Sequence, residues 1–187
     1  MKKRKIILIS GLSTAGKTTI SYNLTKVLPD WVFIDLWAIK NIFEPLGLKD
    51  RKDIISISKK AVITLTREVM KKMQRNIILQ EAQPTSIKKY LRRELRKYNY
   101  KIYSIYLTVP LKHAIKRDIK RKKPTMGIGK NWTEERWNKK IKTNLKKGDI
   151  VIDTSKNTSK AVINIILKHL NEKPKKHPYA NKLRKYC

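Results

Sequence analysis

Several features that mark other classes of protein are scarce in this chain of 187 residues. Its single cysteine is Cys187, so no intramolecular disulfide can form, which fits a protein of the reducing cytoplasm. No stretch approaches the roughly 20 consecutive apolar residues of a membrane-spanning helix. The three histidines, at positions 113, 169 and 177, lack the spacing of zinc ligands. We therefore expect a cytoplasmic protein with no membrane partner and no zinc site.

Acidic residues are also scarce. The chain has 14 aspartates and glutamates against 46 lysines and arginines, which gives a formal net charge of +32. A polyanion such as RNA or DNA is the natural partner for such a surface. The alternative is a solvated basic surface with no specific partner, because net charge reports a tendency to associate and not a function.

Short apolar strands alternate with helical patterns along most of the chain. This alternation predicts an α/β fold of three layers, in which a five-stranded parallel sheet is covered by helices on both faces. The predicted strands are 5–10, 31–34, 77–79, 100–109 and 149–153, and the predicted helices are 18–28, 36–43, 54–74, 86–98, 111–123, 134–145 and 159–170. We expect one domain over 1–170 and a basic, flexible tail over 171–187.

The first predicted strand leads into the sequence GLSTAGKT, at residues 11–18, which matches the phosphate-binding loop G-x-x-x-x-G-K-[ST]. In this loop the lysine reaches the β- and γ-phosphates of a nucleotide, and the hydroxyl after it completes a Mg²⁺ shell. The helix that follows directs its N-terminus, which favours anions, at the loop. The residues expected to bind ATP here are Gly11, Ser13, Thr14, Ala15, Gly16, Lys17, Thr18 and Thr19, with Thr18 also a Mg²⁺ ligand.

Two carboxylates follow the second and third predicted strands, at the edge of the sheet where parallel sheets bind ligands. Asp35 is a candidate base that accepts the proton of an attacking hydroxyl, or alternatively the N-cap of the helix after it. Glu81 is a candidate ligand of Mg²⁺ through water or of a substrate hydroxyl, or alternatively a surface residue.

The basic helix 111–123 precedes a segment with two glycines, and together they suggest a lid around 111–132. Arg117 and Arg121 lie one helical turn apart, hence on one face. They are candidates for stabilising the transferred phosphate, unless the helix is simply basic and has no catalytic member.

Four segments carry a resemblance to small P-loop kinases, especially the chloramphenicol phosphotransferase-like and adenylylsulfate kinase-like groups. They are KIILISGLSTAGKTTI, VLPDWVFIDLWAI, RNIILQEAQ and GDIVIDTS. The resemblance implies a P-loop NTPase fold, makes Asp35 the acceptor base and the stretch with Arg117 and Arg121 the lid, and puts Thr154 and Ser155 near adenine. The chain departs from the chloramphenicol enzymes at Gln80 and Glu81, where they have paired aspartates.

These patterns predict an ATP- and Mg²⁺-dependent kinase that transfers the γ-phosphate to a hydroxyl of a small molecule or nucleotide. Two alternatives remain at this point. One is a polynucleotide kinase acting on RNA or DNA, and the other is a nucleic-acid-binding P-loop ATPase that has no phosphoryl acceptor. The sequence does not indicate an oligomeric state or a preference between ATP and GTP.

Overall fold

A computed structural model describes residues 3–43, 51–81, 84–121 and 132–175. Its centre is a five-stranded parallel sheet in the order β2-β3-β1-β4-β5. The strands are β1 (Arg4–Gly11), β2 (Val32–Asp35), β3 (Ile77–Gln80), β4 (Tyr100–Thr108) and β5 (Ile150–Asp153). The predicted parallel sheet is confirmed, and β1, which carries the phosphate-binding loop at its end, lies in the middle of it.

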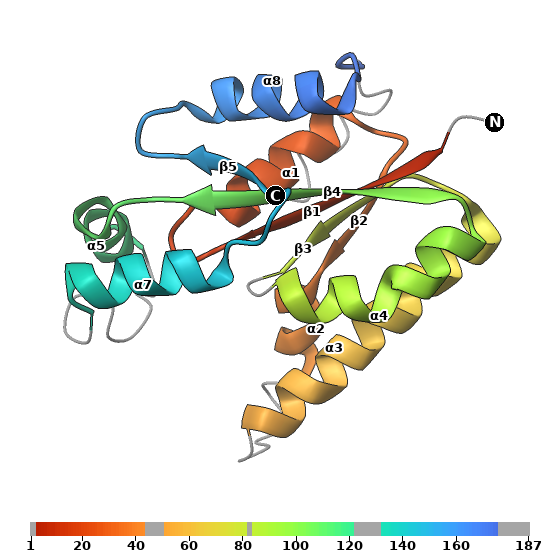
Figure 1. Ribbon diagram of the computed structural model, residues 1–187, viewed down its shortest axis with the longest axis horizontal. Helices are drawn as coiled ribbons and strands as arrows, with labels where there is room; N and C mark the ends of the chain where they lie inside the picture. Colours follow the sequence, from red (N-terminus) through yellow and green to blue (C-terminus); the bar gives the residue numbers. More distant parts are fainter. Residues whose placement is uncertain (1–2, 44–50, 82–83, 122–131, 176–187) are drawn as a thin grey trace.

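Helices cover both faces of the sheet, which confirms the three-layer arrangement (Figure 1). The helical elements are α1 (Lys17–Val27), α2 (Leu36–Phe43), α3 (Arg51–Glu68), the π-helical turn η2 (Val69–Met73), α4 (Pro84–Lys97), α5 (Leu111–Ile119), α7 (Glu134–Asn144) and α8 (Ser159–Leu170). Helices α1 and α8 lie on one side of the sheet, and α3 and α4 lie on the other (Figure 1).

Alternation along β1 divides the apolar core between these two faces. Ile7 and Ile9 pack with α1 and α8, whereas Ile6 and Leu8 pack with α3 and α4. All four side chains are completely buried. Because both faces of a parallel strand are covered, such a strand is apolar throughout instead of alternating with polar residues. This explains why KIILIS is a strand of the sheet centre.

Two helices end differently from the sequence prediction. The helix predicted over 54–74 begins at Arg51 and closes as the π-helical turn η2, after which Gln74 adopts a left-handed conformation with φ 52°. The helix predicted over 111–123 leaves α-helical geometry after Ile119. There the Arg121 N–H donates to the Asp118 carbonyl, which forms a tight turn. Clustered like charges one turn apart disfavour continuing that helix.

The first residues of the predicted tail are docked on the domain. The Lys5 ammonium donates to the Glu172 carboxylate at 2.5 Å, and the Lys175 ammonium donates to Asp30 at 2.5 Å. The rest of the predicted tail lies outside the described residues, as do residues 122–131 of the predicted lid. Among the helices that the structure describes, none is long and apolar enough to span a bilayer.

Candidate active site

The phosphate-binding loop turns tightly at the carboxyl edge of the sheet. Gly11 has φ 144°, and a Cβ at this position would lie 2.3 Å from the Leu107 carbonyl oxygen of β4, so no larger residue fits. Gly16 has φ 86° and is the N-cap of α1, with no side-chain capping hydrogen bond. Because no side chain caps them, the first N–H groups of α1 are available to a bound anion.

Lys17 is a buried cation within this loop. Its ammonium donates to the Gly11 and Leu12 carbonyl oxygens at 3.0 and 2.9 Å, and the side chain is only 9% exposed. Burial and, to a smaller extent, the charge of Arg121 lower the pKa of Lys17 to about 8, while the charge of Asp35 partly opposes the shift. A desolvated cation held by carbonyls alone is suited to binding a phosphate chain.

Asp35 lies at the tip of β2 and caps α2, which is one of the two roles predicted for it. Its Oδ1 accepts a hydrogen bond from the Trp37 N–H at 2.9 Å, at the start of α2, and another from Gln80 Nε2 at 3.1 Å. Burial raises the pKa of the carboxyl group, against the hydrogen bond from Trp37 and the charge of Lys17. Asp35 therefore orients α2 and also faces the loop that carries Lys17.

Sequence reasoning noted Gln80, the last residue of β3, only as a departure from the chloramphenicol enzymes and assigned it no role. Its Nε2 also donates to the Thr18 hydroxyl at 3.2 Å, so one amide joins Thr18 and Asp35. The available signal was strand alternation: Ile78 packs on the face of α1, and a residue two positions further on the same strand shares that face. Glu81, the next residue, is fully buried, and its N–H donates to the Ile9 carbonyl.

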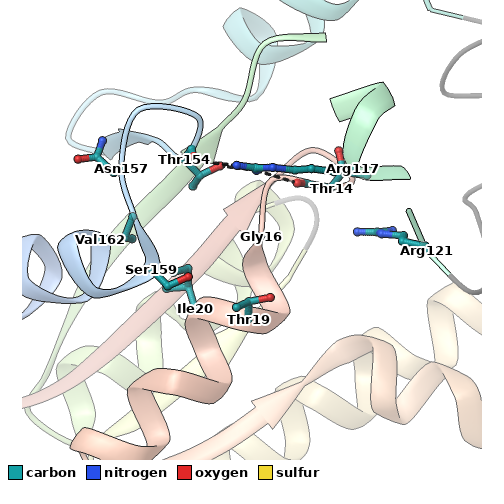
Figure 2. A pocket seen from close by; sticks show the side chains of 10 residues that line it. All are labelled: Thr14, Gly16, Thr19, Ile20, Arg117, Arg121, Thr154, Asn157, Ser159 and Val162. Atoms are coloured by element: carbon teal, nitrogen blue, oxygen red, sulfur yellow. Dashed lines mark hydrogen bonds between the residues drawn. The ribbon is translucent and has the colours of Figure 1, made fainter. Parts of the chain in front are cut away.

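A cavity of about 340 Å³ lies beside the loop, between α1, α5 and the segment after β5 (Figure 2). Arg117 forms one wall. It donates from Nη1 to the Thr154 hydroxyl at 2.8 Å and to the Thr14 carbonyl at 3.2 Å, and from Nη2 to the Thr154 carbonyl at 2.6 Å. Thr19 also lines the cavity, on the side of α1. The Arg117 guanidinium thus links the phosphate-binding loop, at Thr14, to the segment after β5, at Thr154.

The two candidate lid arginines differ in their surroundings. Arg117 is held by backbone and hydroxyl oxygens, whereas Arg121 is 43% exposed and lies 3.7 Å from Asp118. Figure 2 shows the Arg121 guanidinium beside the cavity, separate from that of Arg117. The charge of Arg121 lowers the pKa of Lys17, so Arg121 lies close enough to the phosphate-binding loop to act on it electrostatically.

The remaining predicted residues have separate positions. Ala15 is fully buried in the core on the α1 side, and Ser13 is partly exposed in the loop. The Ser155 hydroxyl donates to Asp153 at 2.7 Å, while Thr154, its neighbour, lines the cavity. The structure thus brings Thr154 to the cavity wall and turns the Ser155 hydroxyl to the end of β5.

The donors at this edge suit magnesium better than a transition metal. Magnesium is usually held by one or two protein oxygens together with phosphate oxygens and water. Thr18 is an exposed residue, and the Gln80 amide links its hydroxyl to the Asp35 carboxylate, an arrangement that fits this pattern. Within the described ranges, no group of three or more histidines, cysteines or acidic residues forms a metal site of another kind.

The sequence matches no protein-family model and no curated protein. Solved structures do resemble the fold. The tunicamycin resistance protein of Deinococcus radiodurans has a TM-score of 0.65 at 16% identity, covering 91% of this chain and 98% of that one. A gluconokinase of Sinorhizobium meliloti has a TM-score of 0.58 at 14% identity, with 91% and 94% covered. The APS kinase of Mycobacterium tuberculosis has a TM-score of 0.58 at 8% identity, with 92% and 100% covered.

These likenesses extend over nearly the whole length of each chain, so they concern the complete domain and not the phosphate-binding loop alone. At such low sequence identity they show the fold, which is that of small P-loop kinases, as the sequence predicted. Fold alone does not define an activity. The activity has to be argued from the residues of the site.

Proposed function

We propose that this protein is an ATP- and Mg²⁺-dependent kinase that transfers the γ-phosphoryl group to a hydroxyl of a small molecule or nucleotide. The observation that carries the proposal is the placement of Asp35, which one amide links to the Thr18 hydroxyl of the phosphate-binding loop. A carboxylate beside that loop supports a role for Asp35 as the base that deprotonates the acceptor hydroxyl.

In the proposed reaction, the acceptor oxygen forms a bond to the γ-phosphorus while the bond from that phosphorus to the β–γ bridging oxygen breaks. Asp35 accepts the proton of the acceptor hydroxyl, and ADP leaves with the electron pair of the broken bond. Lys17, the N-terminus of α1 and Arg121 stabilise the negative charge of the transferred group. Thr18 would hold magnesium, which when bound neutralises phosphate charge.

The direct test is incubation of the full chain with γ-labelled ATP and a panel of acceptors: sugars, nucleosides, hydroxylated antibiotics, and RNA and DNA with 5′-hydroxyl ends. Transfer of label to an acceptor supports the proposal. Release of free phosphate with no labelled product, stimulated by RNA or DNA, would instead identify an ATPase. The same panel with GTP as donor measures nucleotide preference.

Binding of nucleic acid is a second candidate, favoured by the charge of the outer face of α4. The side chains of Lys89, Arg93, Arg96 and Lys97 are all exposed on this helix. Contacts between such residues and phosphates release counterions, so affinity falls steeply with salt. Six contacts would lose roughly three orders of magnitude in affinity between 50 and 200 mM salt. Such binding would favour a polynucleotide as the phosphoryl acceptor or as the activator of an ATPase.

Fluorescence anisotropy with labelled single-stranded RNA tests this second candidate. Replacing the four α4 cations by glutamine is expected to reduce affinity and the salt slope. The matched control replaces four exposed lysines elsewhere: Lys139, Lys142, Lys160 and Lys168. Equal losses in both variants would indicate binding by net charge alone. No binding at 50 mM salt would remove the support for nucleic acid.

A further inference from the structure

Gln80 lies between the phosphate-binding loop and Asp35, the proposed base of the reaction. It is completely buried and belongs to β3, where it pairs in register with Ile9 of β1 on one side and with Asp35 of β2 on the other. A side chain on a strand with neighbours on both sides has little freedom to move. The Gln80 amide is therefore a fixed point between the phosphate-binding loop and Asp35.

The hydrogen bonds define the orientation of this amide. An ionised carboxylate only accepts hydrogen bonds, so the amide nitrogen must face Asp35. The same nitrogen donates to the Thr18 hydroxyl. Both hydrogens of Nε2 are then used, one toward Asp35 and one toward Thr18.

The other end of the amide is left unsatisfied by this orientation. Among the residues that the structure describes, no donor meets Gln80 Oε1, although this oxygen is buried. A buried acceptor with no hydrogen bond is unfavourable and calls for an explanation. The orientation of the amide satisfies the two hydrogen bonds that Nε2 donates and leaves Oε1 without a donor.

We propose that Gln80 is a positioning residue whose single amide nitrogen holds the acceptor base Asp35 and the metal ligand Thr18 at a fixed separation. The inference rests on the proposed kinase function. Many P-loop enzymes hold magnesium with an aspartate in addition to the loop hydroxyl. Here the side chain that reaches the hydroxyl is neutral, so it orients both partners but adds no negative charge to the metal site.

This assignment predicts opposite effects on two measurements in Gln80→Glu. The new carboxylate cannot donate to Asp35 and repels it, so kcat is expected to fall about tenfold or more. The added negative charge beside Thr18 is expected to increase the affinity of the protein–ADP complex for Mn²⁺, a magnesium substitute, by about tenfold. Electron paramagnetic resonance of Mn²⁺ measures that affinity without turnover.

Gln80→Met removes both donated hydrogen bonds at similar length and adds no charge. We expect kcat to fall by about tenfold or more, while the dissociation constant of ADP measured by calorimetry without metal stays within about twofold. Ser104→Ala is the matched control, since it removes another buried polar group, one that belongs to β4. Thermal unfolding of every variant shows whether the fold is retained.

Unchanged kcat in a folded Gln80→Met variant would overturn the assignment. It would also be overturned by Gln80→Glu if Mn²⁺ affinity stayed at the wild-type value. A merely structural role would lower the unfolding temperature without raising metal affinity. The Mn²⁺ and ADP measurements need no acceptor, so they remain decisive even if no acceptor is phosphorylated and the kinase proposal itself fails.

Discussion

Lys5, near the start of the central strand β1, and Lys17, the first residue of α1, are both buried, at 6% and 9% exposure. They differ in what meets their charge. The Lys5 ammonium lies against the Glu172 carboxylate and the Leu170 carbonyl, at the end of α8. The Lys17 ammonium meets only the loop carbonyls of Gly11 and Leu12, and over the described ranges no carboxylate lies within 4.0 Å of it.

The difference separates a buried cation that a carboxylate compensates from a buried cation that only carbonyl oxygens contact. A buried ion that has an opposite charge and hydrogen bonds is compensated within the protein. A buried ion with neutral acceptors alone remains under-compensated, and perturbed groups of this kind gather at functional sites. The buried lysine at the amino edge of the sheet is thus paired within the protein, and Lys17, at the carboxyl edge, is the lysine that we propose to bind phosphate.

The largest effect is expected from Lys17→Ala. Removing the cation that we propose to bind the phosphate chain is expected to lower phosphoryl transfer by about 1,000-fold or more. Activity is measured with γ-labelled ATP, and the fold is checked by circular dichroism. Lys26→Ala, an exposed lysine of the same helix, is the control and should retain activity. If Lys17→Ala retained phosphoryl transfer, Lys17 would not be the phosphate-binding cation that distinguishes it from Lys5.

Asp35→Asn is expected to lower kcat by about 100-fold, because the amide cannot accept the proton of the acceptor. Asparagine can still accept the hydrogen bond from the Trp37 N–H, so α2 should form as before. Affinity for ATP, measured by calorimetry, should change little. Asp30→Asn is the control, since Asp30 pairs with Lys175 far from the loop. Full turnover in Asp35→Asn would remove its role as the base.

Lys5→Met tests the structural lysine. Loss of hydrogen bonds to a charged group is expected to reduce the free energy of unfolding by about 1.5–3 kcal/mol, with kcat unchanged. Urea denaturation provides the measurement. Lys175→Met, which breaks the exposed pair with Asp30, is the control and should cost only about 0.2–1 kcal/mol. A specific loss of kcat in Lys5→Met at full stability would contradict the assignment.

The smallest effect concerns pH. Because the pKa of Lys17 is about 8, the side chain is charged at pH 7 and mostly neutral at pH 9. A one-proton loss at that pKa is expected to weaken ATP affinity about tenfold between these two values. Arginine stays charged throughout this range, so Lys17→Arg should bind with a flat profile. Identical profiles for the two proteins would show that another group controls binding.

The sequence predicted what depends on near neighbours along the chain. The phosphate-binding loop, the helix after it and the N-cap at Asp35 follow from residues a few positions apart, and Asp35 does accept a hydrogen bond from the Trp37 N–H. The alternation of strands and helices predicted the parallel sheet for the same reason. The placement of Asp35 at the sheet edge followed from the general geometry of such sheets.

Tertiary structure decided which distant residues meet. Gln80 contacts Thr18 and Asp35 across 62 and 45 positions, because β3 lies between β1 and β2. The same holds for Arg117, which reaches Thr154, and for Lys5, which reaches Glu172. The local sequence pattern determines whether each segment is a helix or a strand, and it determines the chemistry of the phosphate-binding loop. Strand order and the burial of each polar group arise only when the whole chain packs. Which partner each charged residue contacts is therefore decided by the tertiary structure.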